Sequence, residues 1–204
     1  MSDRYKGLFV TFEGPHGVGK TSLIKAIVHS LRKLGIEIVL TGEPTNSRLG
    51  RFARQAEEKF SGDTLACLYA ADRYFHLENE ILPALKKGKM IFSDRYVESS
   101  LALQRLDGVE LDFIWQLNKK IYKPDLSVIL TISPTVLKKR FAKRESRSRF
   151  EGDKYKKNEV KYYLEAAKFL KKKGFNILLL DSEKNSVKKN AEKVVEKIMK
   201  LDKS

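Results

Sequence analysis

A glycine-rich stretch between an apolar run and a helical pattern constrains the fold of this chain more than any other feature. Residues 8–13, LFVTFE, predict a buried strand, and residues 19–34 carry a helical pattern. Between them, residues 14–21, GPHGVGKT, match G-x-x-x-x-G-K-[ST]. Glycines let the backbone turn its N–H groups toward an anion, and a helix N-terminus adds about half a positive charge. Strand, turn and helix together predict a phosphate-binding loop.

The residues of this loop are expected to bind ATP. Lys20 would reach the β- and γ-phosphates, and the Thr21 hydroxyl would ligate Mg²⁺. A glycine-rich turn that matches by chance is the alternative, and the flanking strand and helix disfavour it. The expected ATP-binding residues are Gly14, Pro15, His16, Gly17, Val18, Gly19, Lys20, Thr21 and Ser22.

Apolar, strand-like runs alternate with helical patterns along the rest of the chain. Further strands are predicted over 36–41, 89–94, 126–132 and 175–181. Helices are predicted over 48–60, 64–87, 98–121 with a break near Asp107, 134–144, 153–173 and 186–201. Alternation of this kind indicates parallel pairing through right-handed crossovers. We therefore predict one α/β domain over residues 1–204, with a five-stranded parallel sheet flanked by helices in three layers.

Charge and cysteine content narrow the class of protein. The formal net charge of +15 favours acidic partners such as nucleotides, nucleic acid or an anionic membrane, although a solvated, lysine-rich surface explains it equally well. The single cysteine, Cys67, excludes an internal disulfide and fits a reducing compartment. No apolar run approaches the roughly 20 residues of a membrane span, and none resembles a signal peptide. We expect a cytoplasmic protein with no membrane partner.

Asp94 and Arg95 end the predicted strand 89–94. Ligands of open α/β sheets bind at the carboxyl ends of the strands. An aspartate in this position would lie near the phosphates and the metal, and the arginine could contact phosphate oxygens. The alternative is a helix-capping aspartate beside a surface arginine.

Tyr69 and Arg73 are four residues apart in the stretch 65–76, so they share one face of a predicted helix. An aromatic ring can stack on a base, which contributes about 1–3 kcal/mol, and a guanidinium binds phosphate oxygens. The pair therefore suits a phosphorylated nucleotide. A core tyrosine beside a partnered arginine is the alternative.

A polar, arginine-rich segment covers residues 143–158, and we interpret it as a candidate mobile lid. Arg147 and Arg149 lie within it. An arginine close to a transferring phosphoryl group can raise the rate about 10³–10⁵-fold. As a bare run of charge, the same segment would be a solvated face.

In their order along the chain, these motifs resemble those of thymidylate kinases, the P-loop kinases that phosphorylate dTMP with ATP and Mg²⁺. The stretch FEGPHGVGKTS is similar to the family's F-E-G-x-[DE]-G-x-G-K-T-T. Residues 68–104 are similar to its L-F-A-A-D-R…D-R-Y-x-x-S-S-x-A-Y-Q. The stretches GEPTNSRLGRFAR, KPDLSVIL and RESRSRFE resemble its E-P loop and following helix, its P-D-L strand and its bacterial and archaeal type of lid.

The resemblance implies the three-layer P-loop kinase fold, a homodimer, and a role for each matching residue. Tyr69 would stack on thymine, and the loop 181–186 would lie near adenine. Asp94 would organise Mg²⁺ together with Thr21. The implied catalytic residues are Lys20, Asp94, Arg95, Arg147 and Arg149. The implied acceptor-binding residues are Glu43, Arg54, Tyr69, Arg73, Ser99, Ser100, Leu103 and Gln104, with Arg54 and Arg95 on the acceptor phosphate.

Three positions depart from the family pattern. His16 replaces an acidic residue that contacts a sugar hydroxyl or metal elsewhere in the family. Leu103 replaces a Tyr or Phe that packs beside the sugar and disfavours ribose. Gly42 stands where many bacterial members have Arg. The first two leave the sugar and base selectivity open.

We expect ATP- and Mg²⁺-dependent phosphorylation of dTMP to dTDP. The alternative acceptors are dUMP, another nucleotide or an unphosphorylated nucleoside, and the arginines at 54, 73 and 95 favour one that carries a phosphate. A nucleic-acid-stimulated P-loop ATPase would use the positive charge, but the sequence shows no second motif of the helicase or switch type. Nucleic acid is therefore not an expected partner.

Overall fold

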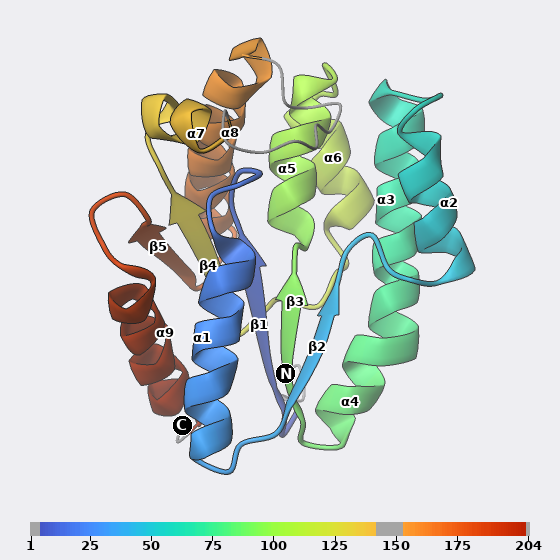
Figure 1. Ribbon diagram of the computed structural model, residues 1–204. Coiled ribbons are helices and arrows are strands. Elements are labelled where there is room, and N and C mark those ends of the chain that lie inside the picture. The colour runs from blue at the N-terminus through green and yellow to red at the C-terminus, as the bar shows by residue number, and fades with distance from the viewer. Residues whose placement is uncertain (1–4, 142–152, 203–204) are drawn as a thin grey trace.

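A five-stranded parallel sheet forms the centre of the protein (Figure 1). The computed structural model describes residues 5–141 and 153–202. The strands lie in the order β2-β3-β1-β4-β5. Their bounds are Leu8–Glu13 (β1), Ile38–Gly42 (β2), Met90–Asp94 (β3), Leu126–Thr131 (β4) and Ile177–Asp181 (β5). The predicted fold class and all five predicted strands are confirmed.

Helices cover both faces of the sheet. Their bounds are Lys20–Lys33 (α1), Arg48–Ala56 (α2), Gly62–His76 (α3), Leu82–Lys86 (α4), Val97–Leu106 (α5), Leu111–Asn118 (α6), Pro134–Phe141 (α7), Asp153–Lys172 (α8) and Val187–Asp202 (α9). A π-helical turn, η1 (Leu77–Ile81), joins α3 to α4, so the predicted helix 64–87 is one rod with an irregular turn. The predicted helix 98–121 is two helices, because the chain turns at Gly108 with φ of 84°.

The central strands are apolar on both faces, which is what a parallel sheet covered by helices requires. Val10 and Phe12 of β1 pack in one core with α1 and α9. Phe9, which precedes Val10 in the strand, packs in a second core with α5, α6 and α8. Alternate residues of a strand point to opposite faces, so Glu13 points to the same side as Phe9. A carboxylate at the end of β1 is thus directed toward α5.

The carboxyl ends of β1, β2 and β3 meet at one edge of the sheet (Figure 1). The loops after these strands lead into α1, α2 and α5. Ligands in open α/β sheets bind at this edge. Among the helices of the described ranges, none combines the length and apolar character that crossing a bilayer requires.

Gly50, in the first turn of α2, allows that helix to pack directly on the loop after β2. A Cβ atom on Gly50 would lie 2.3 Å from the carbonyl oxygen of Thr45, a backbone atom. Replacing Gly by Ala in a helix ordinarily stabilises a protein by about 0.5–1 kcal/mol. At position 50 the clash outweighs this gain, so the replacement lowers the free energy of unfolding.

We therefore predict that Gly50→Ala destabilises the protein by about 1–3 kcal/mol, measured by urea unfolding. Gln55→Ala, an exposed change on the same helix, is the control and stays within about 0.5 kcal/mol of the parent. A Gly50→Ala protein more stable than the parent contradicts the close packing of α2 on this loop.

Candidate active site

The predicted phosphate loop follows β1 and runs into α1, as expected. Gly14 has φ of 130°, and a Cβ atom there would lie 2.5 Å from the Leu130 carbonyl oxygen. Gly19, with φ of 111°, forms the N-cap of α1. Both positions require glycine, since other residues rarely adopt such angles. The N–H groups that open α1 therefore face an anion site over the sheet edge.

Lys20 is buried beneath the loop, with 8% of its surface exposed. Its Nζ donates to the carbonyl oxygens of Gly14 at 2.9 Å and Pro15 at 3.4 Å. Burial, with a further contribution from Arg95, lowers the pKa of Lys20 to about 8. Asp94, Glu13 and Glu159 offset only part of this cost of burial, so a phosphate that arrives beside Lys20 would stabilise its charge further.

A cavity of about 450 Å³ opens beside the phosphate loop and suits the rest of a donor nucleotide. Gly17, Val18, Gly19 and Ser22 line it, together with Ser182 and Asn185 of the loop after β5. The guanidinium of Arg140 joins its two walls, donating to the carbonyl oxygens of Val18 and Ser182, each at 2.9 Å. The loop after β5 therefore lies beside the phosphate loop, and its contact with adenine stays a prediction.

Asp94 and Thr21 fit a Mg²⁺ ion that accompanies the nucleotide. The Oδ1 atom of Asp94 is buried and has no hydrogen-bond partner. Thr21 is exposed in the first turn of α1. Within the described part of the chain, no three His, Cys, Asp or Glu side chains gather around a metal position. One carboxylate, one hydroxyl and phosphate oxygens are the usual protein environment of Mg²⁺ with a nucleotide.

A second cavity, of about 220 Å³, brings together all eight residues predicted to bind the acceptor. Its lining also contains His16 and Arg95. His16, which we expected to bind ATP, also lines this acceptor cavity, and its contact with ATP stays a prediction. Tyr69 lines the cavity with its hydroxyl hydrogen-bonded to Glu57. An aromatic ring, arginines and hydroxyls that line one cavity suit a nucleoside monophosphate.

Arg73 forms the floor of this acceptor cavity. It is 2% exposed and donates to Glu43 from Nε at 2.9 Å, to Asn118 from Nη1, and to the Tyr96 carbonyl and Ser100 hydroxyl from Nη2. Glu43 also contacts His76 at 3.2 Å. So many partners hold the guanidinium in place, and its contact with the base edge or acceptor phosphate stays a prediction.

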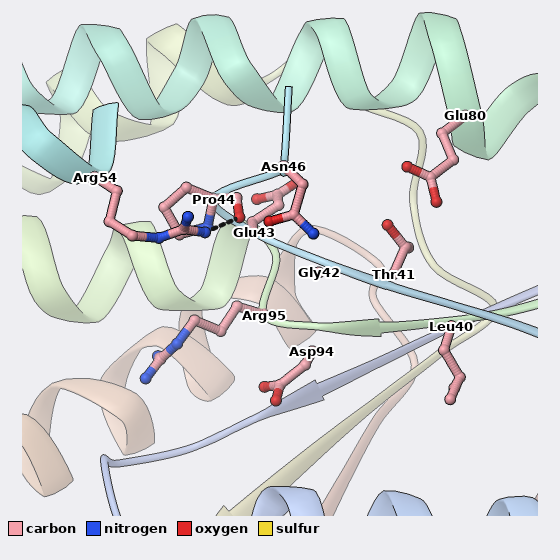
Figure 2. A pocket seen from close by; sticks show the side chains of 10 residues that line it. All are labelled: Leu40, Thr41, Gly42, Glu43, Pro44, Asn46, Arg54, Glu80, Asp94 and Arg95. Carbon is pink, nitrogen blue, oxygen red and sulfur yellow. Dashed lines mark hydrogen bonds between the residues drawn. The ribbon is translucent and has the colours of Figure 1, made fainter. Parts of the chain in front are cut away.

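A third cavity, of about 480 Å³, adjoins the acceptor cavity and is drawn in Figure 2. Arg54 and Arg95 lie at one end of it, and Leu40, Thr41 and Glu80 lie at the other (Figure 2). Arg54 is exposed and donates to the Pro44 carbonyl at 2.7 Å. Because both arginines line this cavity and the acceptor cavity, a phosphate group could reach them from either one.

The Glu13 carboxylate organises the start of α5, and sequence reasoning missed it. It accepts from the Tyr96 N–H at 2.5 Å, the Ser99 N–H at 3.3 Å and the Ser99 hydroxyl at 2.6 Å. Burial and the neighbouring Glu98 raise the pKa of Glu13 to about 8. A glutamate that ends a buried strand directly before a phosphate loop was a usable signal. Asn118, Arg140, Glu159 and Tyr163 carried no such local signal.

Arg147 and Arg149 lie outside the described residues, as does most of the predicted lid 143–158. From Asp153 onward the chain is in α8. The positions of the two arginines relative to the cavities therefore stay predictions.

The fold and the site define a P-loop nucleotide kinase: a phosphate loop with a buried lysine lies between a donor cavity and an acceptor cavity. The family model described as thymidylate kinase matches residues 12–194. A probable thymidylate kinase of Archaeoglobus fulgidus is 31% identical over 200 residues, 97% of this chain and 99% of that protein. The chain belongs to the thymidylate kinase family.

Two further relatives agree with this assignment. The thymidylate kinase of Clostridium novyi is 36% identical over 205 residues, which cover 95% of each chain. A probable thymidylate kinase of Pyrococcus abyssi is 38% identical over 135 residues, 62% of this chain and 66% of that protein.

The lowered pKa of Lys20 predicts a pH dependence of ATP binding. Phosphate recognition needs the ammonium form, and the free protein loses that proton as the pH rises through about 8. We expect the Kd for ATP to be nearly constant between about pH 7 and 7.5 and about tenfold weaker at about pH 9, measured by calorimetry.

Glu13→Gln is the control for this titration, because Glu13 also titrates near pH 8 and Gln resembles its neutral form. If Lys20 is responsible, the Glu13→Gln protein keeps the loss of affinity. An ATP affinity that does not change up to about pH 9 contradicts the account of Lys20.

Proposed function

We propose that this chain transfers the γ-phosphoryl group of ATP to dTMP, giving ADP and dTDP. The observation that carries the proposal is the acceptor cavity, where a stacking tyrosine, three arginines and two serines lie next to the phosphate loop. The membership of the thymidylate kinase family supports the same reaction. The donor would occupy the cavity beside the loop after β5.

On the donor side, Lys20 and the N–H groups that open α1 would hold the β- and γ-phosphates. Thr21 and Asp94 would hold Mg²⁺, which neutralises phosphate charge when it is bound. Phosphoryl transfer asks a protein for positioning and charge stabilisation more than for covalent chemistry. Arg147 and Arg149 belong to this proposal as cations that would close over the γ-phosphoryl group.

On the acceptor side, Tyr69 would stack on thymine, and Arg54 and Arg95 would bind the phosphate. Ser100 and Gln104 would face the edge of the base. The buried Arg73 would keep the floor of the cavity in shape through Glu43 and Asn118. Alignment of the two substrates can supply about 7–11 kcal/mol of the barrier reduction. Exclusion of water would suppress ATP hydrolysis.

A homodimer and a cytoplasmic location complete the proposal. Exposed phenylalanines support an assembly: Phe52 on α2, Phe75 on α3 and Phe113 on α6 expose 50%, 41% and 37% of their surface. The helices α2 and α6 both contact α3. The location rests on the single cysteine of the chain.

The experiment that tests the function is an ADP-release assay with ATP, Mg²⁺ and a panel of dTMP, dUMP, UMP, dCMP, dGMP and thymidine. We expect dTMP to give the highest kcat/KM. The extra methyl group is worth about 1–3 kcal/mol, so dUMP should be a poorer substrate by about 10–200-fold rather than an inactive one. A higher kcat/KM for any other acceptor contradicts the proposal.

Lys20→Ala should reduce the transfer rate to the background of the assay, because it removes the cation beneath the phosphates. The matched control is Lys25→Ala, an exposed lysine of the same helix, which should keep parental activity. Circular dichroism checks that both proteins are folded. A folded Lys20→Ala protein with parental kcat/KM excludes this phosphate loop as the ATP site.

Leu103→Tyr should raise the preference for deoxyribose. Leu103 lines the acceptor cavity, and a larger ring there would crowd a 2′-hydroxyl. The measured quantity is the ratio of kcat/KM for dUMP to that for UMP, which we expect to rise by about tenfold. An unchanged ratio would show that Leu103 does not contact the sugar.

A further inference from the structure

Two side chains of α8, Glu159 and Tyr163, lie one helical turn apart and reach the site from the same face of the helix. Each is 1% exposed. Neither lines the donor or the acceptor cavity. Each is instead hydrogen-bonded to a residue that does line the acceptor cavity, namely His16 and Arg95. The face of α8 that carries them thus lies directly behind the site.

Tyr163 holds the guanidinium of Arg95. Arg95 Nη1 donates to the Tyr163 hydroxyl at 2.9 Å and to the Ser99 hydroxyl at 3.0 Å. The two hydroxyls are themselves 2.9 Å apart, and Ser99 donates to Glu13 at 2.6 Å. Arg95, Tyr163, Ser99 and Glu13 therefore form one connected network that ends on the carboxyl group of Glu13.

The backbone of Arg95 is fixed as well. Its φ of 78° lies in the left-handed region, which residues other than glycine rarely adopt. Its N–H donates to the Phe12 carbonyl at 3.0 Å, and its carbonyl accepts from the Ser93 hydroxyl at 2.7 Å. Because the backbone of Arg95 is held in place, the hydrogen bonds of its guanidinium determine the position of the positive charge.

Glu159 holds the phosphate loop. Its Oε1 accepts from the His16 N–H at 3.0 Å and lies 2.9 Å from His16 Nδ1. Burial lowers the pKa of His16, so the ring is neutral near pH 7. Although burial opposes it, hydrogen bonding from His16 keeps the pKa of Glu159 below its ordinary value. A carboxylate can only accept a hydrogen bond, so His16 Nδ1 carries the ring proton and donates a hydrogen bond to Glu159.

We propose that Glu159 and Tyr163 are positioning residues that hold the phosphate loop and Arg95 in fixed relation to each other. The proposal rests on the proposed function, in which the loop binds the donor and Arg95 binds the acceptor phosphate. One rigid helix then connects the two phosphate-binding groups. It also accounts for His16: an acidic residue there would place a second carboxylate beside the buried Glu159.

Tyr163→Phe tests the connection to Arg95, because it removes only the hydroxyl and keeps the buried ring. We expect kcat/KM for the acceptor to fall about tenfold, the loss of one hydrogen bond to a charged group. The KM for ATP should change less than about twofold. Tyr162→Phe, on the same helix with its ring stacked on Arg105, is the matched control and keeps parental values.

A double-mutant cycle separates positioning from general destabilisation. If Tyr163 acts through Arg95, Tyr163→Phe has less than about a twofold effect on kcat/KM in an Arg95→Lys protein. The proposal for Tyr163 is wrong if Tyr163→Phe and Arg95→Lys lower kcat/KM by factors that simply multiply in the double variant. It is also wrong if Tyr163→Phe changes the KM for ATP and the KM for the acceptor equally.

The hydrogen bond between His16 and Glu159 is tested by placing a neutral or a negatively charged side chain at position 16. His16→Asn and His16→Asp have the same shape, but only Asn can donate to Glu159. We expect His16→Asp to have a kcat/KM about tenfold or more below that of His16→Asn. Adding Glu159→Gln to His16→Asp should recover most of that difference, because Gln can donate to the new carboxylate. Equal activity of the two single variants, or no recovery in the double variant, overturns the proposal for Glu159.

All variants are assayed with whichever acceptor the parental protein prefers. The identity of that acceptor tests the function. The ratios between variants test the positioning roles, whatever the acceptor.

Discussion

The buried guanidinium of Arg95 is the interaction on which the arrangement of this site depends. Burial acts to lower the pKa of Arg95, but Tyr163, Glu13 and Asp94 outweigh it and raise the pKa. These partners come from α8, β1 and β3, which are far apart in the sequence. A buried cation needs such partners, because an unpaired charge in the interior is very costly. The three elements are therefore held together around Arg95, which lines the acceptor cavity.

The two other arginines of the acceptor cavity differ in their freedom. Arg73 is buried and donates to four different residues, so it shapes the cavity whether or not a ligand is bound. Arg54 is exposed and donates to one backbone carbonyl, at Pro44. We infer that Arg54 can reorient toward a phosphate at little cost, whereas moving Arg73 would break a buried network. Similar side chains in one cavity thus serve different purposes.

The sheet and the phosphate loop could be predicted from the sequence because their signals are local, whereas the acceptor residues followed from the family resemblance and their roles stay predictions. Strand 8–13 and the loop after it are adjacent in the chain, and the spacing of Tyr69 and Arg73 is visible within one helix. The contacts of His16 with Glu159 and of Arg95 with Tyr163 span 143 and 68 residues. No local sequence pattern predicts these contacts, because they form only when α8 packs against α5. The place of His16 in the lining of the acceptor cavity could not be predicted from the sequence for the same reason.

We infer that the donor and the acceptor bind in neighbouring cavities and that their phosphates meet between them. The first measurement is the affinity of a molecule that joins adenosine to thymidine through five phosphates, with adenosine tetraphosphate as the control. Because linked ligands gain from a high effective concentration, we predict that the joined molecule binds about 10²-fold or more tightly than the control in calorimetry with Mg²⁺. Equal affinities would show that the two cavities do not form one continuous site.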